Sequence, residues 1–153
     1  MFVVIYIALV FILDQVSKYL IISKMEPYES IPVIKNVFHL TYVNNTGAAF
    51  SMLKGKTLFF TVFTSVVILV LIYSMMKFPL DKRIRITFAL IIGGGLGNLA
   101  DRVRHGYVVD FIDFRVWPVF NIADCALVVG ITILAIIIAL HKDPESLLDP
   151  NRR

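Results

Sequence analysis

The sequence predicts an all-α integral membrane protein: four transmembrane helices with a small β-rich cradle on the extracytoplasmic side. Hydrophobic residues make up 58% of the 153 residues, and the mean hydropathy is +0.82. An ordinary soluble domain is only about 45–50% apolar. Four segments also approach the roughly 20 apolar residues that a helix needs to cross a bilayer. Because the length leaves room for one domain, residues 1–153 are predicted to form a single membrane-embedded unit.

The first predicted span covers about residues 2–22. Its apolar run, residues 2–13, is too short to cross a bilayer, so the helix must continue through Asp14 and Lys18. These two residues are four apart, a spacing at which opposite charges on a helix can pair. A cleaved signal peptide is the alternative. No basic residue precedes the apolar run and no small-x-small cleavage site follows it promptly, so an uncleaved helix is favoured.

The other three spans cover about residues 58–76, 84–103 and 123–140, and the first of these is uncharged throughout. Two longer loops separate the spans, at about 23–57 and 104–122. Within them, residues 31–33, 38–43 and 107–112 have the alternation and β-rich composition of short strands. We therefore expect a β-rich platform over one end of the helices.

Basic residues give the orientation. Four spans place both termini on one side, together with the loop at about 77–83 and the tail 141–153. The total number of basic residues is nearly equal on the two sides, so the count alone does not decide. The short loop is the more densely basic, which favours a cytoplasmic loop, tail and termini. The two longer loops are then extracytoplasmic.

The charge pattern limits the partners. The net charge is +4, but the basic residues are dispersed and no basic helix interleaved with aromatic residues is present. Nucleic acid is therefore not expected as a partner, whereas membrane lipid headgroups are. Cys125 is the only cysteine, and the three histidines are scattered without an H-E-x-x-H motif. We expect no metal and no cofactor.

Two carboxylates lie where a chain this apolar should least tolerate them. Asp110 lies within the strand-like run at 107–112, and Asp124 opens the last span. An ionisable group at a membrane boundary costs free energy unless it is paired, hydrated or used, so the two predict a functional dyad. Carboxylates at close range cannot both ionise, and one would act as base and the other as acid. Asn121 and Asp124 also fit a helix capping box, which explains Asp124 equally well by itself.

A cluster of polar residues precedes the two aspartates in the sequence. Asn98, Asp101 and Arg102 stand at i, i+3 and i+4, so one helix face carries an amide, a carboxylate and a guanidinium. That face is too polar for lipid and suits a buried network near the site. Gly93 and Gly97 form a GxxxG pattern, which favours close helix packing.

Five motifs, in this order, resemble those of the lipoprotein signal peptidases, the bacterial type II signal peptidases. They are Asp14-Gln15-x-Ser17-Lys18, Asn45-x-Gly47-Ala48-Ala49-Phe50, Gly97-Asn98-x-x-Asp101-Arg102, Val108-Val109-Asp110-Phe111 and Phe120-Asn121-x-Ala123-Asp124. Each motif is modest alone, but their joint order and spacing make chance agreement improbable. The similarity runs from about residue 8 to 140.

The resemblance implies a monomeric aspartyl endopeptidase of the bacterial cytoplasmic membrane, with its site near the extracytoplasmic face. Its substrates would be diacylglyceryl-modified prolipoproteins, cut just before the lipidated cysteine, and globomycin would compete for the cleft. Asp110 and Asp124 would be catalytic. The substrate-binding residues would be Asn45, Asn98, Arg102 and Asn121, and the residues supporting the fold would be Asp14, Lys18, Gly47 and Asp101.

Two other classes stay open on the residues alone. Intramembrane carboxylates are equally typical of a proton- or ion-coupled transporter or channel, but such sites tend to lie near the bilayer midplane on broken helices. Asp110 and Asp124 both lie at one boundary, beside β-rich loops. A structural membrane scaffold is the third class, and it leaves the polar face from Asn98 to Arg102 unexplained.

Overall fold

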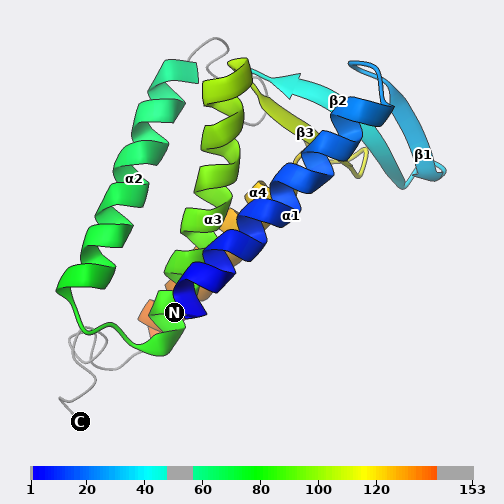
Figure 1. Ribbon diagram of the computed structural model, residues 1–153. Helices are drawn as coiled ribbons and strands as arrows, with labels where there is room; N and C mark the ends of the chain where they lie inside the picture. The colour runs from blue at the N-terminus through cyan, green and yellow to red at the C-terminus, as the bar shows by residue number, and fades with distance from the viewer. Residues whose placement is uncertain (1, 48–56, 141–153) are drawn as a thin grey trace.

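The computed structural model describes residues 2–47 and 57–140, which form four helices and one small sheet (Figure 1). In chain order the elements are α1 (Phe2–Lys24), β1 (Ser30–Ile34), β2 (Phe38–Asn45), α2 (Thr57–Lys77), α3 (Lys82–His105), β3 (Val108–Asp113) and α4 (Ile122–Leu140). All four helices are long and apolar enough to cross a membrane. The predicted fold class is confirmed.

Each helix begins and ends within two residues of a predicted span. The sheet lies beyond the C-terminal ends of α1 and α3, whereas the turn between α2 and α3 lies at the opposite end of the bundle (Figure 1). The strands of both predicted extracytoplasmic loops therefore gather at one end. The orientation in the membrane stays a prediction, and the tail 141–153 lies outside the described residues.

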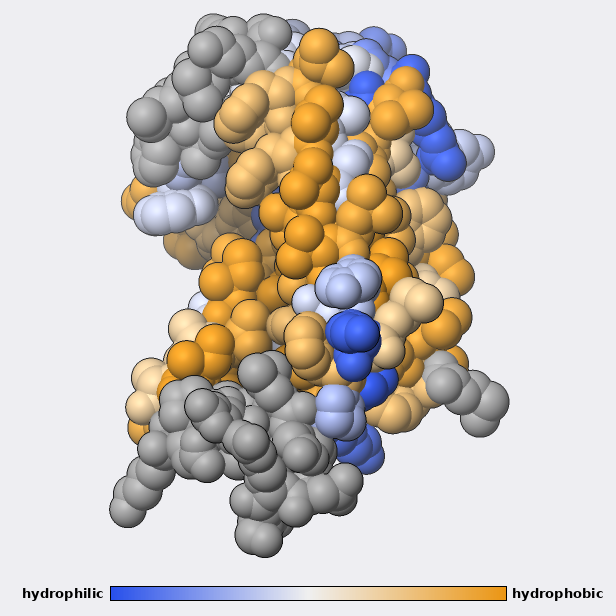
Figure 2. All heavy atoms as spheres, turned by 90° about the vertical axis from the view of Figure 1, so that its left-hand side faces the viewer, coloured by the Kyte–Doolittle hydropathy of each residue, from blue (hydrophilic) through white to orange (hydrophobic). Residues whose placement is uncertain are grey.

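Helix α3 is the centre of the bundle, because it packs against α1, α2 and α4. In its most apolar stretch 61% of the residues are buried, against 6% for α2. The α2 side of the molecule accordingly presents a mostly apolar surface (Figure 2). A surface of that kind suits contact with lipid rather than water.

Glycines let the neighbours of α3 approach closely. A Cβ on Gly93 would lie 2.9 Å from Cβ of Val10 in α1, and a Cβ on Gly97 would lie 2.5 Å from Oδ2 of Asp14. The predicted packing role of this GxxxG pair is confirmed. Gly94, which the pattern did not single out, allows the closest approach of α4: its Cβ would lie 2.5 Å from the carbonyl oxygen of Ala123.

The sheet has the order β1-β2-β3, with both pairs antiparallel. All three predicted strands are present. Tyr42, Val109 and Phe111 from β2 and β3 pack against Ile21 and Met25, at the C-terminal end of α1. This apolar contact fixes the sheet on the bundle, and it therefore sets the position of β3 relative to the helices.

Candidate active site

Asp110 and Asp124 meet at one pocket of about 300 Å³, at the sheet end of the bundle. Asp110 comes from β3 and is only 1% exposed, whereas Asp124 lies half-buried in the first turn of α4. The polar side chains that line the pocket are Asn45, Asn98, Arg102, Asp110 and Asp124. The apolar ones are Phe60, Val108, Trp117, Pro118, Val119, Phe120 and Val128. The pocket thus joins two carboxylates to an apolar wall.

The start of α4 places Asp124. The Asn121 side-chain oxygen accepts a hydrogen bond from the Asp124 backbone N–H at 2.9 Å, and the Asn121 N–H donates to Oδ2 of Asp124 at 3.3 Å. This is the predicted capping box. Both interpretations of Asp124 therefore hold. The capping box fixes the carboxylate at the helix N-terminus, and the carboxylate also lines the pocket.

The sheet places Asp110. On β3 it lies opposite Val43 of β2, with its neighbours Val109 and Phe111 in the apolar core beneath the sheet. Alternation along the strand then turns Asp110 away from that core. Its carboxylate accepts hydrogen bonds from Nδ2 of Asn45 at 2.8 Å and from Nδ2 of Asn121 at 2.7 Å.

Burial and the negative charge of Asp124 raise the pKa of Asp110 to about 7, although the hydrogen bonds from Asn45 and Asn121 and the positive charge of Lys18 oppose them. Near neutral pH this carboxyl can therefore hold a proton or release one. A carboxyl with such a pKa is what general acid–base chemistry requires at that pH.

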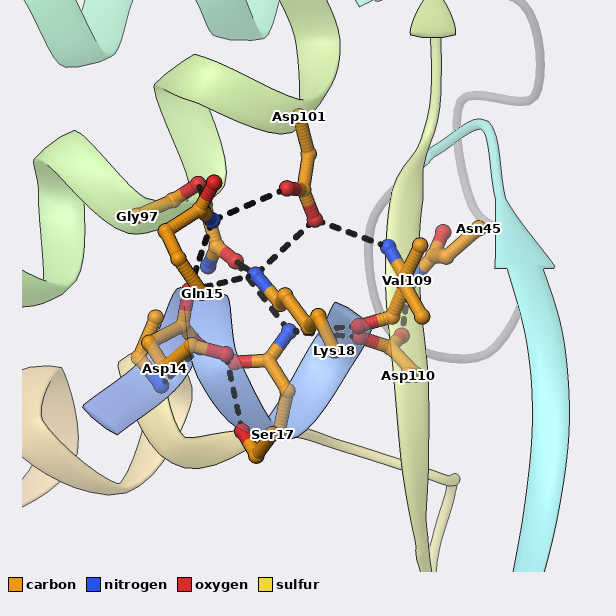
Figure 3. A network of polar contacts seen from close by, with 12 residues as sticks. Asp14, Gln15, Ser17, Lys18, Asn45, Gly97, Asp101, Val109 and Asp110 are labelled. Atoms are coloured by element: carbon orange, nitrogen blue, oxygen red, sulfur yellow. Dashed lines mark hydrogen bonds and ion pairs between the residues drawn. The ribbon is translucent and has the colours of Figure 1, made fainter. Parts of the chain in front are cut away.

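Behind the dyad lies a buried charge cluster, formed by Asp14, Lys18 and Asp101 (Figure 3). The Lys18 ammonium lies 2.8 Å from Oδ2 of Asp14 and 2.9 Å from Oδ2 of Asp101. The predicted pairing of Asp14 with Lys18 is confirmed. Both carboxylates also bind backbone: Asp14 accepts from the N–H of Ala123 in α4, and Asp101 accepts from the N–H of Val109 in β3. The cluster therefore ties α1 to the two elements that carry the dyad.

The predicted polar face of α3 divides in two. Asn98 and Asp101 enter the buried network, where Asn98 donates to Oδ1 of Asp124 at 2.7 Å. Arg102 instead turns toward α2, with its guanidinium 5.5 Å from the centre of the Phe60 ring, and it lines the pocket. Helical spacing predicts a common face for all three residues. It does not predict which neighbouring element each side chain contacts.

Gly47 and Gln15 also take part in the polar network around the site. The Gly47 N–H donates to the Asn45 side-chain oxygen at 2.9 Å, so Gly47 helps to orient Asn45. The other residues of that motif, 48–50, lie outside the described residues. Gln15 had no predicted role, yet its amide donates to Asp14 and Asp101 and accepts from Arg104. Its place between Asp14 and Ser17 in a polar helix turn was the available signal.

The apolar wall of the pocket was also not predicted. Trp117, Val119 and Phe120 belong to the segment between β3 and α4. Within residues 2–47 and 57–140, no group of three or more His, Cys, Asp or Glu side chains is placed to hold a metal ion.

Comparison with known proteins gives the family. A family model described as "Signal peptidase (SPase) II" matches residues 6–140. The chain belongs to the signal peptidase II family. It is 58% identical over 132 residues to the lipoprotein signal peptidase of Caldanaerobacter subterraneus subsp. tengcongensis, a match that covers 86% of this chain and 91% of the relative. It is 52% identical to the lipoprotein signal peptidase of Halothermothrix orenii, with the same coverage of both chains.

The fold agrees with the family. A solved structure described as a bacterial membrane enzyme superposes with a TM-score of 0.83 at 34% identity, covering 92% of this chain and 91% of the other. A second structure with that description gives a TM-score of 0.78 at 38% identity. This member of the signal peptidase II family is therefore a membrane peptidase with the architecture of known membrane enzymes.

Proposed function

We propose that this chain removes the signal peptide from diacylglyceryl-modified prolipoproteins by cutting just before the lipidated cysteine, with Asp110 and Asp124 as the catalytic pair. The observation that carries the proposal is the pocket: two carboxylates from different elements line it, and one of them has a pKa of about 7. The relatives named lipoprotein signal peptidase support the choice of substrate.

The reaction follows from one proton shared by two carboxyls. The ionised member takes a proton from a water molecule as that water attacks the scissile carbonyl carbon. The protonated member donates its proton to the carbonyl oxygen. When the tetrahedral intermediate collapses, the C–N bond breaks and the leaving amine takes a proton from the pair. One hydroxyl of the intermediate returns its proton to the pair as the C=O bond re-forms. Such coupled carboxyls titrate as a pair, so the acid and base roles belong to the dyad.

The other polar residues of the pocket position the substrate in this proposal. Asn45 and Asn98 present amide groups beside the scissile bond, and Arg102 brings a cation that can bind backbone carbonyl oxygens. Asn121 is fully buried and does not line the pocket, so it acts through its hydrogen bonds with Asp110 and Asp124. Asp14, Lys18 and Asp101 hold α1 against β3 and α4, and Gly47 orients Asn45. These supporting contacts keep the dyad in place.

The apolar wall suits the lipid part of the substrate. Phe60 on α2 and Val128 on α4 line the pocket beside the carboxylates, where acyl chains in the bilayer could reach it. We place the enzyme in the bacterial cytoplasmic membrane as a monomer, with the pocket toward the extracytoplasmic face and both termini in the cytoplasm. Lipid headgroups contact its surface, and globomycin competes for the pocket.

The direct test is cleavage of a purified diacylated prolipoprotein by the variants Asp110→Asn and Asp124→Asn. Each variant should lose cleavage while remaining folded in detergent, because an amide can neither share the proton nor activate water. Asp113→Asn is the matched control: this carboxylate lies on the same strand, bound to Thr41 and Arg115 instead of the pocket. The control should retain activity. Substantial turnover by Asp110→Asn or Asp124→Asn, free of wild-type enzyme, would refute the dyad.

A further inference from the structure

We propose that Lys18 is a positioning residue for the dyad: it fixes the orientation of the Asn98 amide, so that the amide NH₂ group is directed at Asp124. This inference rests on the proposed function for its activity assay. It assigns Lys18 a role beyond support of the fold, and that role is exerted through one named side chain.

The Lys18 ammonium is fully occupied. It is buried, and it lies within 3.0 Å of three oxygens, those of Asp14, Asp101 and Asn98. An ammonium has three N–H donors and no acceptor, so each hydrogen has one partner. Figure 3 shows the side chain reaching from α1 into the centre of this network. Lys18 is thus held rigidly with one N–H aimed at the Asn98 oxygen.

That contact decides which way the Asn98 amide faces. Its oxygen accepts from Lys18 at 3.0 Å and from Nδ2 of Asn121 at 3.1 Å. A rotated amide would turn its NH₂ group toward both of these donors and leave two donor–donor contacts in a buried site. The amide nitrogen must therefore face the other way, where it donates to Oδ1 of Asp124 at 2.7 Å.

The other two amides that bind the dyad, those of Asn45 and Asn121, are oriented by backbone N–H groups. The Asn45 oxygen accepts from the N–H of Gly47, and the Asn121 oxygen accepts from the N–H of Asp124. Their NH₂ groups are thereby directed at Asp110. Among these three amides, Asn98 is the one whose oxygen accepts from a charged side chain, so substitution of Lys18 removes one of the two donors that orient it.

Charge and orientation have to be separated in the test. Charged groups surround Lys18 from several elements: Asp14 on its own helix, Asp101 on α3, and the dyad on β3 and α4. Lys18 lowers the pKa of Asp110, against the larger effects of burial and of Asp124. Removing Lys18 alone would therefore change the field at the dyad as well as the amide.

The double variant Lys18→Met with Asp101→Asn removes one positive and one negative charge, so the cluster keeps its net charge of −1. In a diacylated prolipoprotein assay we expect kcat to fall by about tenfold or more, with little change in KM. The acidic limb of the pH profile should move to higher pH, because the dyad loses a hydrogen bond that favours its ionised form. Asp101→Asn alone keeps Lys18 against Asn98 and should lose much less.

Gln15→Leu is the matched control for a general disturbance of the cluster, since Gln15 binds Asp14 and Asp101 without touching Asn98. It should keep the wild-type pH profile. If the double variant does not fold, Lys18→Met with Asp14→Asn supplies a second comparison in which the cluster also keeps its net charge of −1. A folded variant of either kind with wild-type kcat and pH profile would overturn the inference. Failure of the wild-type enzyme itself to cut the substrate would instead refute the proposed function.

Discussion

At the scale of the residue, the most informative group is Asp110. Its carboxyl is buried beside a second carboxyl, yet the hydrogen bonds that it receives from Asn45 and Asn121 favour ionisation. Burial and the charge of Asp124 outweigh them and raise the pKa of Asp110 to about 7. A carboxyl usually titrates near 3.9, so these surroundings move its proton into the physiological range.

This raised pKa predicts the alkaline side of the pH profile. Below pH 7 the dyad holds the proton that must reach the scissile carbonyl oxygen, and above pH 7 that proton is progressively lost. Cleavage should therefore decrease as the pH rises through about 7, by close to tenfold for each further pH step of one. The measurement is kcat/KM against pH in one detergent, with a substrate that has no group titrating in the range. Activity that stays constant up to pH 9 would contradict it.

At the scale of the element, α3 determines the geometry of the site. It carries Asn98, Asp101 and Arg102, and it contacts the other three helices. Its glycines set how closely α4, with Asp124, can approach. The nearest atom to a Cβ on Gly94 is a backbone oxygen of α4, whereas a Cβ on Gly95 would meet side-chain atoms of Ile68 and Thr64, the nearest of them at 3.3 Å.

The two neighbouring glycines give a matched pair of variants. Gly94→Ala should destabilise the protein by about 1–3 kcal/mol, because the helix backbones must separate to admit the methyl group. It should also reduce cleavage, since α4 would carry Asp124 away from Asp110. Gly95→Ala should be tolerated, because the Ile68 side chain can adjust. Thermal unfolding in detergent and the cleavage assay measure both effects. Equal behaviour of the two variants would show that the close approach at Gly94 is unimportant.

The sequence predicts the elements well because each depends on local chemistry. The span at 58–76 is visible from its lack of charge, and the strands are visible from their alternation. Contacts between distant segments are a different matter. Asp14 binds the backbone of Ala123, 109 residues away, and the Arg102 guanidinium lies over the Phe60 ring of α2. Such choices depend on how helices rotate against each other, which helical spacing does not specify.

At the scale of the whole molecule, polar and apolar groups occupy different parts of the bundle. The charge cluster and the dyad lie toward the sheet end, whereas the α2 side is mostly apolar (Figure 2). Buried charges within a membrane span are expensive, by about 2.5–3.5 kcal/mol for a lysine or an aspartate at the helix centre. Mutual pairing of Asp14, Lys18 and Asp101 offsets that cost. Under the proposed function, this arrangement would bring the dyad to the depth at which a lipid-anchored peptide lies.

The lipid part of the substrate gives the last prediction. If acyl chains in the bilayer deliver the peptide to the pocket, a prolipoprotein without its diacylglyceryl group should be cleaved far more slowly. Burial of acyl chains contributes about 0.8 kcal/mol per CH₂, so even a few buried methylenes change kcat/KM more than tenfold.

The comparison requires both forms of one prolipoprotein, at matched concentrations and in the same detergent, with Asp110→Asn as the blank. Equal kcat/KM for the two forms would show that the enzyme recognises the peptide alone. The apolar wall of Phe60 and Val128 beside the dyad would then have no part in substrate binding.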